Sequence, residues 1–187
     1  MQTKFLEGTH GTSMSRASNI VKIKKFIPSS DGLCGKGVYF WAINNSLDFA
    51  KKLAKNWWRF SLKHHSDVFK DDYDKGLAVL KATIKPIENE FYDATSDEFL
   101  SLISIVAEEK SILTKNDVLK LRAALVDEIE KEKNVKFSVV KIDVDVPGKS
   151  KGEVAPPSFY WIKKQAACYV VKDKAEEIIQ DIELIEA

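Results

Sequence analysis

The stretch Gly35-Lys36-Gly37-Val38-Tyr39-Phe40 decides how this sequence is interpreted. Two glycines at alternate positions, followed by a β-branched residue and two aromatic residues, are typical of a tight turn that opens into a strand. His10-Gly11-Thr12 lies upstream, and a helical pattern separates it from this turn. We therefore expect strands at residues 4–12 and 37–42, and the two motifs together are far more specific than either alone.

The bulk properties of the chain are those of an ordinary globular protein. Its 187 residues are enough for one substantial core, so we expect a single domain (1–187) with room for an inserted subdomain. Hydrophobic residues make up 44% and charged residues 30%, and the formal net charge is +1. Because the charge is nearly balanced, any phosphate or nucleic-acid site must come from local clustering of basic side chains.

The cysteine and histidine residues give no metal-binding pattern. Cys34 and Cys168 have neither metal-ligand spacing nor a disulfide framework, which suits a reducing compartment. His64 and His65 are adjacent and would point to different sides of a helix, so no metal is expected. No signal peptide or membrane-spanning stretch is evident. We expect a cytoplasmic protein that does not engage a membrane.

Short strands and interspersed helices, without regular alternation, predict an α+β fold. The further strands are expected at residues 77–85, 135–146, 159–162, 168–171 and 182–185. One helix is expected behind Ser13–Ser15 with apolar residues as far as Ile27, and another behind the N-cap candidate Ser46. Residues 61–76 are expected to be loop or irregular helix. Two more helices, beginning at the capping sequences Thr95–Glu98 and Thr114–Asp117, form a helical insertion at about 95–133.

The paired motifs resemble the NAD-binding core of ADP-ribosyltransferases of the poly(ADP-ribose) polymerase-like, His-Tyr-Glu type. Members of that superfamily carry His-Gly-Ser/Thr on one strand and Gly-Lys-Gly-Ile/Val-Tyr-Phe on the next. The resemblance covers residues 8–50 and about 165–172. It implies a split β-sheet core with flanking helices, and NAD as a co-substrate. Such enzymes cleave NAD, release nicotinamide and transfer ADP-ribose.

The resemblance assigns His10 to the adenosine ribose hydroxyls and Gly11 to the nicotinamide carboxamide, with Thr12 beside them. A glycine leaves its backbone N–H and C=O open to such a ligand. The alternative is that Gly11 only turns the chain and that His10 is a surface residue.

The same resemblance places Tyr39 on the nicotinamide ring and ribose, with Gly37 allowing the loop to approach the ligand. The alternative for Tyr39 is a core aromatic of a strand. Ser46 and Phe49 match the family's serine and stacking aromatic, with a one-residue shift and Phe in place of Tyr. Phe keeps the stacking face and loses only the hydroxyl. Helix capping by Ser46 and a core contact by Phe49 are the alternatives, and capping is compatible with ligand binding.

The third signature residue departs from the family. Its catalytic Glu opens a late strand, and Cys168 occupies the matching position here. By resemblance, loss of this Glu is associated with transfer of single units or with inactivity. Gln165, just before the strand, is the preferred substitute, and Glu153 on the Gly/Pro loop is the alternative.

The acceptor is a macromolecule, RNA/DNA or protein. Residues 51–65 combine lysines with Trp57 and Trp58, which would suit phosphate contacts and base stacking if exposed. The favoured alternative is an amphipathic helix with both tryptophans in the core. A small transferase of this kind resembles bacterial toxins of toxin–antitoxin or antiphage systems, which implies a possible antitoxin partner. A catalytically inactive NAD- or ADP-ribose-binding module and a plain nucleic-acid-binding module are the competing hypotheses.

Overall fold

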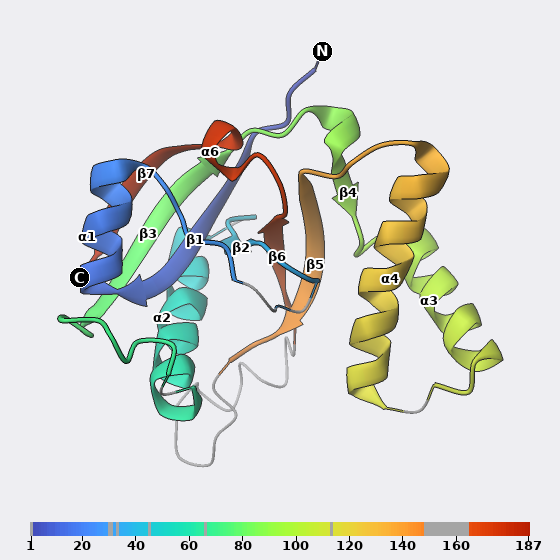
Figure 1. Ribbon diagram of the computed structural model, residues 1–187, viewed down its shortest axis with the longest axis horizontal. Helices are drawn as coiled ribbons and strands as arrows, with labels where there is room; N and C mark the ends of the chain where they lie inside the picture. Colours follow the sequence, from blue (N-terminus) through green and yellow to red (C-terminus); the bar gives the residue numbers. More distant parts are fainter. Residues whose placement is uncertain are drawn as a thin grey trace.

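A computed structural model of the chain describes residues 2–29, 32, 34–44, 46–65, 67–112, 114–147 and 165–187. Within these residues the fold is α+β, with seven strands in one mixed open sheet and five α-helices (Figure 1). The strands are β1 (Leu6–Ser13), β2 (Val38–Ala42), β3 (Leu77–Ile84), β4 (Phe91–Asp93), β5 (Val139–Asp145), β6 (Gln165–Val171) and β7 (Ile179–Glu186). The helices are α1 (Met14–Ile23), α2 (Leu47–His64), α3 (Asp97–Glu109), α4 (Lys115–Lys133) and the short α6 (Ala175–Ile178).

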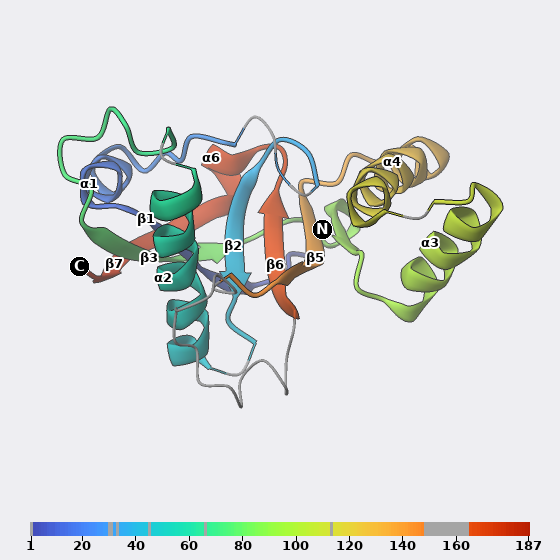
Figure 2. The ribbon, with the colours of Figure 1, turned by 90° about the horizontal axis from the view of Figure 1, so that it is seen from below.

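The strand order in the sheet is β4-β5-β6-β2-β1-β3-β7, and every neighbouring pair is antiparallel except β4–β5. The β1–β3 ladder is long, whereas the β1–β2 ladder consists of Gly8 opposite Ala42 and Thr9 opposite Trp41. Figure 2 shows β2 and β6 running steeply across the direction of β3 and β7. The described strands therefore form one sheet that changes direction at a narrow joint, rather than two separate sheets.

The two faces of the sheet carry separate hydrophobic clusters. Helix α1 packs Ala17 and Ile20 with Phe40 on one face. Helix α2 packs Ala50 and Leu53 with Trp41 on the other face. Helices α3 and α4 extend this second cluster at the β4–β5 end of the sheet (Figures 1 and 2). The helical pair at 97–133 is thus part of the main core.

Most helix starts follow the capping residues in the sequence. The hydroxyls of Ser13, Ser46 and Thr114 each accept a hydrogen bond from a backbone N–H of the first turn. The start of α3 differs from the prediction because the cap is Ser96, which accepts from Phe99 N–H. Thr95 instead donates its hydroxyl to Asp93, at 2.6 Å.

Several predicted boundaries were wrong. Helix α1 ends at Ile23 because Lys24 adopts a left-handed conformation with φ of 55°, so Ile27 lies outside the helix and is 83% exposed. Helix α2 continues to His64, beyond the expected end at about residue 60. The strand expected at 135–146 is limited to 139–145, and β7 begins earlier than expected, at Ile179. The strand expected at 159–162 lies outside the described residues.

Candidate active site

His10 is fixed across the point where β1 and β2 part. The β1–β2 ladder stops at Thr9 and Trp41, and the His10 ring then reaches the neighbouring strand, with Nδ1 2.9 Å from the Tyr39 carbonyl oxygen. A carbonyl can only accept, so Nδ1 carries the proton. The ring also packs against Phe26 and Phe40, with centroid distances of 5.3 and 5.7 Å.

Burial lowers the pKa of His10 below its ordinary value of 6.5, and the positive charge of Arg16 lowers it further, against the opposing hydrogen bond to Tyr39. The imidazole is therefore neutral at pH 7. With Nδ1 as the donor, Nε2 is left as a hydrogen-bond acceptor. A ribose hydroxyl is the kind of donor that such a nitrogen can accept.

Gly11 has a packing role that the sequence did not reveal. A Cβ atom built on Gly11 would lie 2.0 Å from the Ala54 carbonyl oxygen of α2, so only glycine allows the helix to approach the strand this closely. The neighbouring Thr9 donates its hydroxyl to the Ala50 carbonyl of the same helix, at 2.8 Å. Thr12 is buried, with 3% exposure. The expected contact of Gly11 with a nicotinamide carboxamide stays a prediction.

The Tyr39 side chain holds the turn that precedes β2. Its hydroxyl donates to the Gly35 carbonyl at 2.7 Å and accepts from Cys34 N–H at 3.1 Å. The ring lies so close to Gly32 that a Cβ atom there would be 2.1 Å from the hydroxyl oxygen. Gly35 has a φ of +79°, which suits glycine. Gly37 lies against β6, where a Cβ atom would be 2.8 Å from Val170 Cγ1.

The His10 and Tyr39 side chains lie on opposite faces of the sheet. The His10 ring contacts Phe26 and Phe40, which belong to the cluster under α1. Tyr39 packs against the cluster that contains Trp41 and the buried residues of α2. The structure therefore brings His10 to the main chain of Tyr39, but it does not bring the two rings together.

Ser46 and Phe49 lie at the start of α2, which follows β2 after a short connection. The Ser46 hydroxyl accepts from Phe49 N–H at 3.2 Å, so the predicted capping role of Ser46 is confirmed. Phe49 is half-buried and packs against the same cluster as Tyr39. A core contact by Phe49 is thus present, and its stacking on nicotinamide stays a prediction.

The structure does not bring Gln165, the preferred third residue, close to Tyr39. Cys168 pairs with Trp41 and is 3% exposed, and burial raises the pKa of its thiol, so it cannot act as a charged replacement for Glu. Val170 is the residue opposite Tyr39, and Gln165 lies five positions earlier along β6. At about 3.4 Å per residue this separation is roughly 17 Å. Gln165 is exposed, with Nε2 3.3 Å from Asp145 Oδ1. Glu153 lies outside the described residues.

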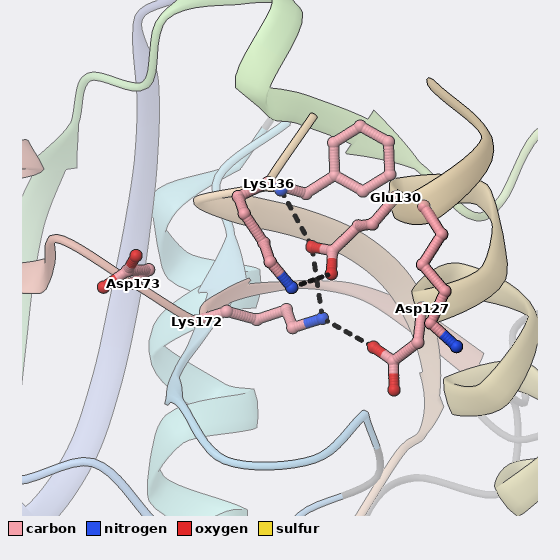
Figure 3. A pocket seen from close by; sticks show the side chains of 7 residues that line it. Asp127, Glu130, Lys136, Lys172 and Asp173 are labelled. Atoms are coloured by element: carbon pink, nitrogen blue, oxygen red, sulfur yellow. Dashed lines mark hydrogen bonds and ion pairs between the residues drawn. The ribbon is translucent and has the colours of Figure 1, made fainter. Parts of the chain in front are cut away.

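A cavity of about 470 Å³ lies between the C-terminal half of α4 and the residues after β6 (Figure 3). One of its lining residues is Glu130, whose side chain is buried (5% exposed) and accepts a hydrogen bond from Phe137 N–H at 2.8 Å. The ammonium groups of Lys136 and Lys172 lie 3.4 and 3.5 Å from its two carboxylate oxygens, and Lys172 also pairs with Asp127 at 3.2 Å. Figure 3 shows both lysine side chains pointing toward Glu130.

This charged cluster was not among the predicted site residues, and scattered lysines and acids on a helix give no sequence signal for it. Its lysines and carboxylates largely satisfy one another, and Glu130 joins the end of α4 to the start of the following segment. The arrangement is that of a structural ion-pair network. Arg122 also joins α4 to the sheet, because its Nη1 donates a hydrogen bond to the Asp143 carbonyl of β5 at 3.0 Å.

The described part of the chain has no candidate metal cluster and no candidate membrane span. No three His, Cys, Asp or Glu side chains among those residues are grouped so that they could hold a metal ion. None of the described helices combines the length and apolar character needed to cross a bilayer.

Comparison of the chain with protein-family models, with curated proteins and with solved structures gave no match. Only the residues and their geometry therefore bear on the function.

Proposed function

We propose that this protein is an NAD-dependent mono-ADP-ribosyltransferase with an ADP-ribosyltransferase-like fold. It would cleave NAD, release nicotinamide and attach ADP-ribose to a cellular macromolecule, as an intracellular toxin or antiphage effector with a possible antitoxin partner. The nicotinamide of NAD is already a cationic leaving group. The site therefore needs to orient the dinucleotide and stabilise a cationic ribose, with little acid catalysis.

The observation that carries the proposal is the joint between β1 and β2. The two motifs that resemble the superfamily lie on these neighbouring strands, and the ladder between them stops at Thr9 and Trp41. Just beyond it, a neutral His10 holds Tyr39 through its carbonyl group and keeps Nε2 as an acceptor. The change of sheet direction at this joint, within one continuous sheet, supports a core of the kind that the resemblance implies (Figure 2).

The activity can be tested with purified protein, adenylate-labelled NAD and a cell lysate. We expect release of free nicotinamide and label in a macromolecular fraction. His10→Ala and Tyr39→Ala should each abolish both signals, whereas Tyr73→Ala, at an aromatic side chain that is 87% exposed, should not. Absence of nicotinamide release from NAD with the folded wild-type protein, together with unlabelled protein and nucleic-acid fractions, would overturn the proposal.

A second candidate is a module that binds NAD or ADP-ribose without turning it over. The buried, uncharged Cys168 at the position of the family's Glu favours it, as does the distance of Gln165 from the residue facing Tyr39. Isothermal titration calorimetry distinguishes the two. Saturable binding of NAD, with zero nicotinamide release across protein and nucleic-acid acceptors, would favour the binding module.

A further inference from the structure

The last turns of α2 carry a row of aromatic side chains in which Trp57 and His64 are exposed and Phe60 is half-buried. Trp57 is 41% exposed and stacks on Phe60 with ring centroids 6.0 Å apart and an interplanar angle of 27°. The centroid of the Phe60 ring lies 4.9 Å from that of His64 and 5.4 Å from that of His65. The expectation that the tryptophans fill the core was wrong. The fully buried residues of this helix are small or aliphatic, namely Ala50, Leu53, Ala54 and Ser61.

Figure 1 shows the C-terminal end of α2 extending past the ends of the strands. The second tryptophan, Trp58, is half-buried, and its Nε1 donates to the Lys75 carbonyl at 3.2 Å. Trp58 therefore fastens the helix to the following loop, and Trp57 presents its ring to solvent.

Two exposed basic residues lie on the same helix, about a third of a turn around its axis from the aromatic row. Lys52 and Arg59 are seven residues apart, which is about two helical turns, so they lie on one side of α2. Both are exposed, and neither makes an ion pair within the described part of the chain. Lys51 and Lys55, by contrast, both pair with Glu186. Asp48, in the first turn, is the only acidic residue of the helix.

We propose that this surface, made by Lys52, Arg59, Trp57, Phe60 and His64, binds single-stranded nucleic acid. Aromatic rings at the surface stack on unpaired bases, and unpaired cations a third of a turn further around the helix contact the phosphates of the same strand. An apolar protein partner would not require the free cations, and an acidic one would not require the stacked rings. From Lys52 to His64 the helix rises by about 18 Å, enough for several nucleotides.

The inference that single-stranded nucleic acid is the acceptor of ADP-ribose rests on the proposed transferase function. The binding itself requires neither NAD nor the residues at the β1–β2 joint. Binding is therefore measured without NAD, so that failure of the surface and failure of the transferase are separate results.

The test is fluorescence anisotropy with a fluorescein-labelled single-stranded RNA of about 15 nucleotides, the DNA of the same sequence, and the corresponding duplexes. Measurements at several salt concentrations between about 50 and 200 mM give the salt dependence of the dissociation constant. We expect both single strands to bind more tightly than the duplexes. Trp57→Ala should weaken single-strand binding roughly 5- to 150-fold, with little change in the salt slope. Trp57→Phe should recover most of the affinity.

Arg59→Ala and Lys52→Ala should each weaken binding and reduce the slope of log K against log salt by about 0.7, the value for one phosphate contact on a single strand. The matched controls are Lys110→Ala, at an exposed lysine after α3, and Phe5→Ala, at an aromatic residue that is 73% exposed. Circular dichroism checks that each variant is folded. Three results would overturn the proposal: no binding at low salt, equal loss of affinity in the controls, or single-strand binding that is no tighter than duplex binding and that Trp57→Ala leaves unchanged.

Discussion

Replacing Gly11 by Ala tests the close contact between β1 and α2. The new Cβ atom would lie 2.0 Å from the Ala54 carbonyl oxygen, and real Cβ atoms essentially never approach within 3.0 Å. The helix must therefore move away from the strand by about 1 Å or more. This movement also stretches the hydrogen bond between the Thr9 hydroxyl and the Ala50 carbonyl, now 2.8 Å.

Overpacking of a dense core costs about 1–3 kcal/mol, and a clash with a backbone carbonyl belongs at the upper end because it cannot be relieved by a rotamer change. A loss of about 3 kcal/mol is a large part of the 5–15 kcal/mol that stabilises a typical domain. With a urea m-value of about 2–3 kcal/mol/M, the unfolding midpoint should fall by about 1–1.5 M.

The assay is urea unfolding followed by circular dichroism. The matched control is Gly76→Ala, where the new Cβ atom would be 3.0 Å from the carboxylate oxygen of Asp74, the end of a flexible side chain. That variant should stay within about 0.5 kcal/mol of the wild type. Equal midpoints for the two variants would refute the contact. Because Gly11 is needed for packing, lost activity in a Gly11 variant is informative only when folding is shown to be intact.

Three further predictions concern the site and the charged cavity. Because the pKa of His10 is lowered in the folded protein, the unfolded chain binds more protons below the ordinary pKa of 6.5, so stability should fall as pH drops from 7 toward 5. Urea midpoints measured across this range should fall less steeply for His10→Gln. Tyr39→Phe, which removes the hydroxyl that anchors the preceding turn, should speed amide hydrogen exchange in that turn, and exchange unchanged from the wild type would contradict this role. Glu130→Ala should cost about 1–3 kcal/mol in thermal or urea unfolding because it leaves the buried Phe137 N–H unpaired, whereas the exposed Glu128→Ala should change stability by less than about 0.5 kcal/mol.

The sequence predicted local features well because they depend on neighbouring residues. Capping by Ser13, Ser46 and Thr114 and the strand at 77–84 are set by hydroxyl positions and by short apolar runs. The short β4 strand was missed because its three residues have no periodicity of their own. The choice of Ser96 over Thr95 as a cap depends on Asp93, which binds the threonine instead.

The candidate site was predicted less completely because it depends on long-range packing. The sequence indicated that His10 and Tyr39 lie on neighbouring strands, but it could not show which face each ring occupies. That choice follows from the strand register and from burial against two different helices. Likewise, helical spacing predicted both tryptophans in the core and did not reveal that Trp57 is 41% exposed.

The narrow ladder between β1 and β2 has a mechanical consequence. A sheet resists bending through its inter-strand hydrogen bonds, and here one half is joined to the other by the pairs Gly8–Ala42 and Thr9–Trp41. Further connections come from the hydrogen bond between His10 Nδ1 and the Tyr39 carbonyl, and from α2, which packs on Gly11 of one half and near Trp41 of the other. The shortest ladder of the described sheet therefore lies next to His10. A ligand that contacted both strands there would add a connection between the two halves of the sheet and would restrict their relative movement.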